Sequence, residues 1–452
     1  MALTNEIITE QLREKDAQIE RLQRALIAVS AVNQDLQKKA QSEAELKNSK
    51  SWKLTAPLRA LAELLKRLRR GQAQPAPAGE PVSRDRVFCD LVGAARIDIC
   101  CFEEERALAE SLRGLLREEG ILSDILTDFA PDGSGLPRLL IDPPSDCEIS
   151  GCCILLNRTG SPEDPDRSGL LEQCYAILET REEKLPFYEH DQSLSRRVYY
   201  LAVEEETLPF WFLRFLLAND LISFDRFYER TRSFLNLSGD RICINMPESA
   251  ERGEQFRSRN QYGFQTFPGV RHRIGWIGCA LSYRYIARRA VESGLQRITI
   301  CEDDVVFPAD FAEKMAVITE YLERSPQWDV FSGVMSDVGN VEILRDEEYR
   351  GLRFLWVNRM ISTVFDVFSE DALRLIAEWD PNRQDCWSQT IDRYLESRNM
   401  AVVTNLPFLV GHDEGEYSTI WGGANALYSD MIAASQRKLK RLAREGRKGR
   451  QA

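Results

Sequence analysis

The chain is poor in histidine and lacks the cysteine spacing of a zinc finger. Only 3 histidines occur among 452 residues, and none of the 11 cysteines forms a Cys-x-x-Cys motif. A phosphohydrolase with two metal ions usually needs several His and Asp ligands, so this class of enzyme is disfavoured. The cysteines lie mostly in apolar, strand-like runs, and we interpret them as reduced core residues of a cytoplasmic protein.

Long apolar runs and glycine-rich nucleotide motifs are also missing. No stretch of about 18 apolar residues occurs, so we expect no membrane-spanning helix. The polar and acidic start of the sequence gives no indication of a signal peptide. Neither Gly-x-Gly-x-x-Gly nor a P-loop is present, which removes the usual sequence signals of a dinucleotide or nucleoside triphosphate site.

Negative charge is in excess, but it is unevenly distributed. The formal net charge is −12, whereas residues 1–70 carry +5 and residues 437–450 carry +7, so the rest of the chain carries −24. Such an acidic body argues against nucleic acid as a partner. The basic ends, including a basic C-terminal tail at residues 426–452, favour a peripheral contact with an anionic membrane, although basic termini are often only solubilising.

The first 84 residues divide into two segments. Residues 1–50 follow a heptad pattern in which eight of ten seam positions are apolar, with Lys15 and Asn33 as the exceptions. This pattern predicts a coiled coil and a homo-oligomer, the alternative being one amphipathic helix that lies on the rest of the protein. Residues 51–84 join a Leu-rich, basic helical pattern to a flexible linker. That helix has the composition of an in-plane membrane helix, and packing on the catalytic domain is an equal alternative.

Residues 85–235 alternate strand-like and helix-like runs, which predicts a Rossmann-like α/β domain. We expect helices at residues 103–119 and 170–182, and one further helix in the aromatic-rich run at residues 209–231. The domain is either a degenerate sugar-nucleotide domain or a packing and partner module. The sequence leaves both interpretations open.

The most informative segment is RITICEDDVVF at residues 297–307. It is an apolar strand that runs into three consecutive carboxylates, Glu302, Asp303 and Asp304. Burying such a cluster is costly unless a cation meets it. Mn²⁺ and Mg²⁺ take oxygen ligands and often bridge substrate phosphates, and open α/β sheets bind ligands at the carboxyl ends of their strands. The segment therefore predicts a metal–diphosphate site, with a solvated acidic turn as the alternative.

Several further motifs carry a family resemblance. A helical pattern, GWIGCALSYRYIARRAVESG, precedes the acidic strand and stops at Gly294. Together with ICINMPESAER, WDVFSG, FDVFSEDALRLI, TIDRYL and PFLVGHDEGEYSTI, it resembles glycosyltransferase family 25, the lipooligosaccharide and collagen galactosyltransferase group, over residues 238–425. Tyr283 and Trp276 stand where the family usually has a His and an acidic residue.

This resemblance implies a GT-A-like domain that inverts the anomeric centre. It would transfer a hexose from a UDP-sugar, UDP-galactose or UDP-glucose, to a cell-envelope glycan such as lipopolysaccharide. A catalytically inactive, membrane-associated scaffold with a degenerate transferase fold is the competing hypothesis.

The family pattern also implies roles for single residues. Asp304 and Asp303 would bind Mn²⁺ or Mg²⁺ with help from His412, unless this histidine is structural. The expected donor-site residues are Asn245, Arg252, Glu302 and Asp303. Asp392 is the expected acceptor base, with Asp366 and Asp413 as alternatives, and its competing interpretation is an acid at a helix N-terminus. Arg252 and Arg259 could pair with the diphosphate or a sugar acid, and for Arg259 we expect a surface salt bridge instead.

The heptad pattern gives a first testable prediction. Deleting residues 1–50 should lower the oligomeric state without unfolding the remainder, because a Pro- and Gly-containing linker separates the seam from the body. Light scattering on the full-length and truncated proteins measures the two masses per particle. Equal subunit numbers in both proteins would exclude assembly through this segment.

Overall fold

The structure is a computed structural model. It describes Leu91 and residues 94–451, apart from 131–134, 190, 192, 326, 384–385, 387–388, 414–416, 419–422 and 425–427. The chain divides into two compact units, Met1–Gly93 and Ala94–Ala452. The predicted coiled coil at residues 1–50 and the amphipathic segment at residues 51–84 therefore lie outside the described residues, and every element below belongs to the second unit.

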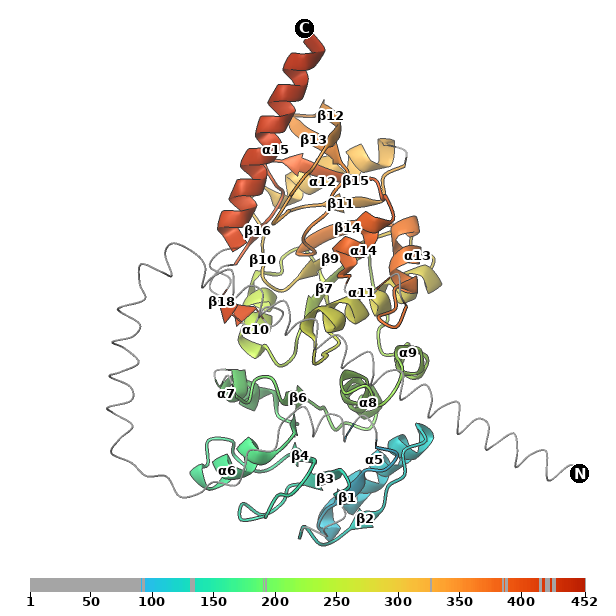
Figure 1. Ribbon diagram of the computed structural model, residues 1–452, viewed down its shortest axis with the longest axis vertical. Coiled ribbons are helices and arrows are strands. Elements are labelled where there is room, and N and C mark those ends of the chain that lie inside the picture. The colour runs from blue at the N-terminus through green and yellow to red at the C-terminus, as the bar shows by residue number, and fades with distance from the viewer. Residues whose placement is uncertain are drawn as a thin grey trace, which may run out of the picture. The chain divides into compact units, whose positions relative to one another are not determined.

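The first sheet consists of six parallel strands in the order β2-β1-β3-β4-β5-β6 (Figure 1). The strands are β1 (Asp98–Cys100), β2 (Ile125–Leu126), β3 (Arg138–Ile141), β4 (Cys153–Asn157), β5 (Ala176–Glu179) and β6 (Val198–Tyr200). Their connections contain η1 (Glu103–Glu105), α5 (Arg106–Glu118), α6 (Pro165–Gln173), η2 (Glu182–Lys184) and α7 (Leu185–Glu189). The predicted α/β class is thus confirmed for this part of the chain.

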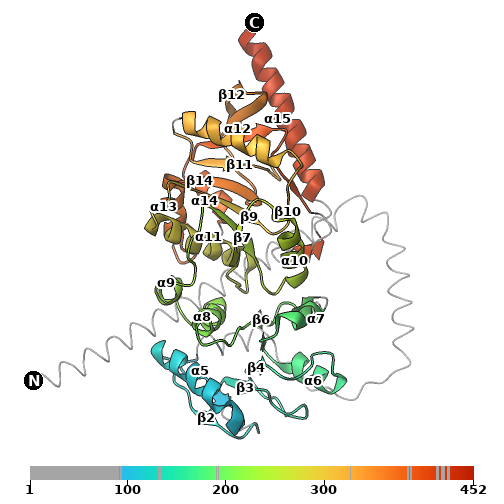
Figure 2. The same ribbon diagram turned by 180° about the vertical axis from the view of Figure 1, so that it is seen from behind.

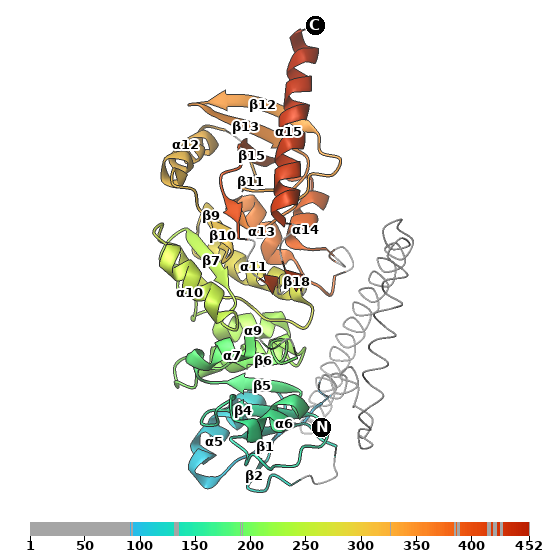
Figure 3. The same ribbon diagram turned by 90° about the vertical axis from the view of Figure 1, so that its left-hand side faces the viewer.

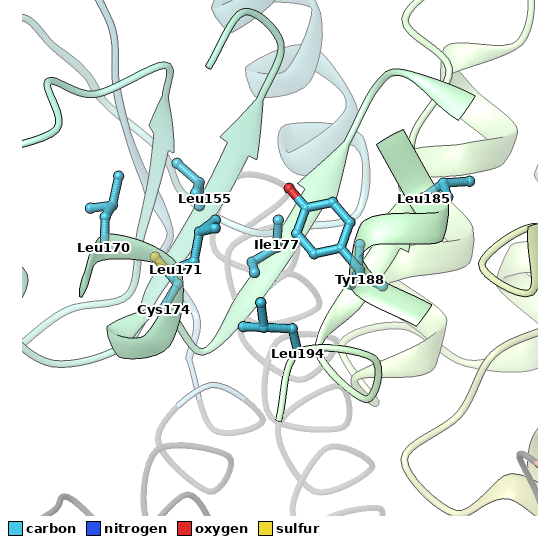
Figure 4. Packing of buried hydrophobic residues seen from close by; sticks show 9 residues of the cluster. Leu155, Leu170, Leu171, Cys174, Ile177, Leu185, Tyr188 and Leu194 are labelled. Atoms are coloured by element: carbon cyan, nitrogen blue, oxygen red, sulfur yellow. The ribbon is translucent and has the colours of Figure 1, made fainter. Parts of the chain in front are cut away.

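One face of this sheet is closed by a compact apolar cluster. Figure 4 shows Leu155 of β4 and Ile177 of β5 in one cluster with Leu171 of α6 and Tyr188 of α7. These four side chains are at most 1% exposed. The two short helices are therefore held by burial of their apolar residues, since their length alone would not make them stable.

Two local predictions for this region are wrong. The predicted helix at residues 170–182 ends at Gln173, and Ala176–Glu179 form β5 instead. All four residues of β5 are buried, and a short apolar run in a parallel sheet carries no period that separates it from a helix. The aromatic run forms two helices, α8 (Leu208–Ala218) and α9 (Phe224–Thr231). Asp220 ends the first in a left-handed conformation with φ 57°, which acidic and amide residues tolerate.

The second sheet has eight strands in the order β12-β13-β15-β11-β14-β9-β7-β8, and it mixes parallel and antiparallel pairs. The strands are β7 (Arg241–Asn245), β8 (Gln265–Pro268), β9 (Arg297–Glu302), β11 (Val330–Ser332), β12 (Ile343–Tyr349), β13 (Leu352–Val357), β14 (Phe365–Ser369) and β15 (Val402–Leu406). Two small ribbons accompany it, β10 (Val305–Val306) with β16 (Gly411–His412), and β17 (Tyr417–Ser418) with β18 (Gly423–Ala424).

Helices cover both faces of the second sheet (Figure 2). They are α10 (Ala250–Arg259), α11 (Gly275–Glu292), α12 (Phe311–Arg324), α13 (Glu370–Glu378), α14 (Ile391–Ser397) and α15 (Tyr428–Gln451). On β14, Phe368 contacts Tyr283 of α11 at 5.9 Å between ring centroids, and Phe365 contacts Phe311 of α12 at 5.6 Å. Because residues 365 and 368 of one strand point to opposite sides, α11 and α12 lie on opposite faces.

The long helix α15 runs beside β12 and β13 (Figure 3) and contacts β12 and β16. It buries Leu439 and Ala443, whereas Arg437, Arg441 and Arg444 are exposed. No helix among the described residues combines the length and the apolar composition that crossing a bilayer requires.

A buried ion pair joins α8 to the loop between β7 and α10. The guanidinium of Arg214 donates to both carboxylate oxygens of Glu248, at 2.7 and 2.9 Å, and the two side chains are 1% and 4% exposed. Burial disfavours the charged carboxylate, but the Arg214 guanidinium outweighs it and lowers the pKa of Glu248 to about 2.

This ion pair predicts a pH dependence of stability. The pKa of Glu248 is lower in the folded state than its unfolded value of about 4.3. Its contribution is therefore complete above pH 4.3 and is lost as the pH falls toward 2. Glu248→Gln should be less stable than wild type at pH 7, and the difference should shrink on acidification. Urea unfolding between pH 2.5 and 7 measures it, with the exposed acid variant Glu229→Gln as the control. A difference that stays constant over this range would contradict the assignment.

Candidate functional site

The acidic cluster lies at the carboxyl end of β9, in the middle of the second sheet. Glu302 is the last residue of β9, and Asp303 and Asp304 form the turn before β10. β7 runs parallel to β9, so Asn245 at its end reaches the same edge (Figure 1). The predicted strand at this position is confirmed, and so is the preceding helix, α11, after which Gly294 adopts a left-handed φ of 70°.

Asp303 is held by two side chains from the β7–α10 segment. The amide of Asn245 donates to Asp303 Oδ2 at 2.7 Å, and the guanidinium of Arg252 contacts Asp303 Oδ1. The same guanidinium nitrogen lies 3.3 Å from Asp304 Oδ2. All four residues are buried. The sequence predicted a cation next to these carboxylates. Arg252 of the chain itself supplies part of this positive charge.

Asp304 turns toward the β10–β16 ribbon. His412 pairs with Val305 across this ribbon, and its Nε2 lies 3.2 Å from Asp304 Oδ2. Burial opposes ionisation, but hydrogen bonding to His412 and the charge of Arg252 together hold the pKa of Asp304 below its usual value. Burial likewise opposes the protonation of His412, and the hydrogen bond to Asp304 raises its pKa overall. Asp304 Oδ1 is buried and has no hydrogen-bond partner among the described residues.

Glu302 points away from this pair toward α11. Thr363 donates its hydroxyl to Glu302 Oε1 at 2.7 Å, and Tyr283 donates to the backbone oxygen of Thr363 at 2.7 Å. Burial, and then the neighbouring charge of Asp304, raise the pKa of Glu302 to about 7. The three consecutive acids are therefore separated, and each has different partners. Thr363 was not identified from the sequence, where it lies in no recognisable motif.

Tyr283 and Trp276 each have a packing role. Tyr283 is fully buried and supports Thr363 as described, while Trp276 contacts Trp379 with ring centroids 6.4 Å apart. The positions where the sequence departs from the family pattern are thus filled by aromatic packing.

The two candidate bases differ in exposure. Asp366 sits in the central strand β14 opposite Ile300 and Ser332 and has no exposed surface. Burial, and then the charges of Asp392 and Glu302, raise its pKa well above the usual range. Asp392 lies in the first turn of α14 and is 8% exposed. Its Oδ1 accepts from the hydroxyl of Thr390 and, at 2.8 Å, from the backbone N–H of Arg393.

Asp392 lies on the Glu302 side of the cluster. Burial, and then the charges of Glu302 and Asp392, raise the pKa of Cys279 on α11, so both carboxylates lie near this thiol. Asp413, the other alternative, pairs with Arg259 at 3.0 Å, and both side chains are partly exposed. The surface salt bridge that we expected for Arg259 is therefore present.

The structure thus brings together Asn245, Arg252, Asp303, Asp304 and His412, with Glu302 adjacent to them. No group of three or more His, Cys, Asp or Glu side chains within the described part of the chain is arranged to hold a metal ion. Glu248 was also missed from the sequence, although it lies within the ICINMPESAER motif, because nothing local indicated its pairing with Arg214.

Comparison with known proteins gives a family match for one segment of the chain. Residues 273–332 match the model of glycosyltransferase family 25 (LPS biosynthesis protein), which is a short part of the chain. They span α11, β9 and the acidic cluster, and they end with β11, whereas Asn245, Arg252, Asp392 and His412 lie outside them. A search of curated proteins finds no match. The resemblance is therefore confirmed over residues 273–332, where the acidic cluster lies.

Proposed function

We propose that the protein is an inverting, GT-A-like glycosyltransferase whose domain covers residues 238–425. It transfers a hexose from UDP-galactose or UDP-glucose to a cell-envelope glycan such as lipopolysaccharide. The observation that carries this proposal is the acidic cluster at the carboxyl end of β9, inside the family match, where Asp304 keeps a buried oxygen without a hydrogen-bond partner among the described residues. A buried carboxylate oxygen of this kind is costly unless a ligand meets it.

The described residues fit a divalent cation, Mn²⁺ or Mg²⁺, at Asp304 and His412. Asp304 Oδ1 has no hydrogen-bond partner in the described part of the chain, and the imidazole lies 3.2 Å from the other oxygen. Because Mg²⁺ is commonly held by one or two carboxylates and completes its shell with phosphates and water, the Asp304 carboxylate would anchor the cation, and His412 would join it as an unprotonated imidazole. When bound, such a cation neutralises the charge that develops on a leaving diphosphate.

The remaining residues of the cluster position the donor. Asn245 and Arg252 fix the carboxylate of Asp303, which leaves Asp303 as an oriented acceptor for a ribose hydroxyl or as a support for the cation site. Arg252 also brings a buried positive charge to the place where the diphosphate would lie. Thr363 and Tyr283 hold Glu302 on the α11 side.

Asp392 is the proposed acceptor base. It retains a small exposed surface, whereas Asp366 has none. Burial also raises the pKa of Asp366 well above the usual range, which disfavours its charged form. A general base must reach the proton that it removes, and the exposed surface favours Asp392 for this role.

Two features support a location at a cytoplasmic membrane surface. The described part of α15 exposes Arg437, Arg441 and Arg444 on the side opposite the buried Leu439 and Ala443. Such a basic stripe is attracted to anionic lipid headgroups. Self-association through residues 1–50 would multiply this weak contact.

Replacing Asp304 tests the donor site. Asp304→Asn should abolish metal-dependent binding of UDP, because it removes the carboxylate with the unmatched oxygen. Calorimetric titration with UDP and Mn²⁺ measures the affinity, and circular dichroism checks the fold. Asp240→Asn, an exposed acid before β7, is the matched control and should bind normally. Equal affinity of the Asp304 variant and wild type would remove the site assignment. If wild type itself bound no UDP, the inactive scaffold would be favoured.

Replacing Asp392 tests the acceptor side. Asp392→Asn should reduce turnover by about two to four orders of magnitude, the usual range for general base catalysis, while UDP affinity stays near normal. Turnover is measured as UDP release from UDP-galactose or UDP-glucose in the presence of lipopolysaccharide. If Asp392 only stabilises the start of α14, the substitution would cost about 0.3–1 kcal/mol of stability and leave turnover unchanged.

Asp366→Asn is the matched buried variant, and its effect should be on stability. Because the folded pKa of Asp366 is raised, the charged carboxylate opposes folding increasingly as the pH rises above about 3.9. Asparagine lacks this cost, so the variant should gain stability relative to wild type between pH 4 and 7 and keep its turnover. Urea unfolding at several pH values follows this gain. A large loss of turnover would instead identify Asp366 as the base.

A further inference from the structure

The apolar helix α8 contains one buried charged side chain, Arg214, and apolar packing does not explain its presence. Ten of its eleven residues are buried, and Arg214 among them is 1% exposed. A buried guanidinium is costly to desolvate, and replacing a buried ion pair by apolar side chains is often neutral or even stabilising. Stability alone therefore gives no reason for an arginine at this position. The groups that the Arg214 guanidinium contacts indicate a second role.

Arg214 contacts the segment between β7 and α10, which holds Asp303, and also the loop after β8. Two of its nitrogens bind Glu248, which lies between Asn245 and Arg252 in the chain. Its Nε donates to the carbonyl oxygen of Gly269 at 2.8 Å. The N–H of Gly269 in turn donates to the carbonyl oxygen of Asn245 at 2.8 Å. One side chain thus fixes the end of β7, the start of α10 and the loop after β8.

This segment has little freedom of its own. A Cβ at Gly269 would lie 2.8 Å from Met246 Sδ, and a Cβ at Gly253 would lie 2.9 Å from Asn245 Oδ1. The backbone therefore approaches these side chains as closely as only glycine allows. Since Arg252 begins the next turn after Glu248, a displacement of Glu248 would move the guanidinium that contacts Asp303.

The first sheet leaves no open ligand site at the carboxyl ends of β4 and β5. The carboxyl ends of β4 and β5 are filled by a buried polar network around Glu179. Both oxygens of Glu179 accept hydrogen bonds, from Asn157 at 2.6 Å, Tyr188 at 2.9 Å and Arg181 at 2.9 Å. At the neighbouring ends of β1 and β3, Arg158 pairs with Glu105 and its N–H donates to Asp142. Open sheets bind ligands at this edge, and here the chain's own side chains occupy it.

We propose that Arg214 is a positioning residue of the donor site, acting through Glu248 and Gly269 on Asn245 and Arg252. The inference rests on the proposed function for its effect on nucleotide binding. The sequence left the role of residues 85–235 open. In this proposal the region holds the β7–α10 segment in its binding conformation.

Arg214→Lys tests this proposal because it keeps the charge and removes the bidentate fork. We expect faster hydrogen exchange in peptides covering residues 243–256, with unchanged exchange in α12. UDP affinity, and the KM for the UDP-sugar, should weaken by about three- to thirty-fold with a smaller change in kcat. The control is Arg353→Lys, which breaks a bidentate pair with Asp346 in the β12–β13 hairpin. It should leave exchange at residues 243–256 and UDP affinity unchanged.

A double variant covers the case in which the lysine variant does not fold. Arg214→Met with Glu248→Met replaces the pair by apolar side chains of similar size, which should restore stability but not UDP affinity. Wild-type affinity and exchange at residues 243–256 in a folded variant would overturn the proposal, and so would faster exchange spread evenly over the second sheet. If wild type binds no UDP, the proposed function fails, and the exchange pattern still decides whether Arg214 holds this segment.

Discussion

Three consecutive carboxylates at the end of a buried strand are the constraint on which the second half of the molecule depends. Like charges so close together cannot all remain ionised and buried unless each finds a different partner. In the structure the three carboxylates point in different directions. Glu302 accepts from Thr363, Asp303 binds Asn245 and Arg252, and Asp304 faces His412. Elements far apart in sequence must therefore meet at this edge, which ties β7, α10, β16 and the segment before β14 to β9.

This separation also sets the charge state of the cluster. Burial raises the pKa of Glu302 to about 7, whereas His412 and Arg252 hold the pKa of Asp304 below its usual value against burial. Adjacent acids with pKa values driven apart are characteristic of sites that divide chemical roles among similar groups. Structural ion-pair networks perturb pKa values as well. The buried Oδ1 of Asp304, which has no hydrogen-bond partner among the described residues, is therefore what points to a ligand.

The parts predicted well from the sequence are those governed by local pattern. The helical period before Gly294 and the apolar run before Glu302 predicted α11 and β9. The family resemblance, and not a local pattern, singled out Asn245 and Arg252, which the structure places in contact with Asp303. Prediction failed where tertiary packing overrides local pattern. Ala176–Glu179 form a strand because they are buried and pair with β4 and β6 on either side, and nothing in three apolar residues and a glutamate signals that. Arg214 gave no signal at all, since its partner lies 34 positions away in the chain.

The two sheets show how an acidic residue at a strand end can be told apart as structural or functional. Glu179 ends β5 and is as buried as any residue of the cluster, yet both of its oxygens accept hydrogen bonds from Asn157, Tyr188 and Arg181. Asp304 follows β9 in a similar place, and within the part of the chain that the structure describes only one of its oxygens has a hydrogen-bond partner. Burial and position are therefore shared by the two sites, and the difference lies in the count of satisfied lone pairs. A saturated carboxylate fixes its own loop, whereas an unsaturated one can bind a further group. This difference supports the proposal that the donor binds at the second sheet.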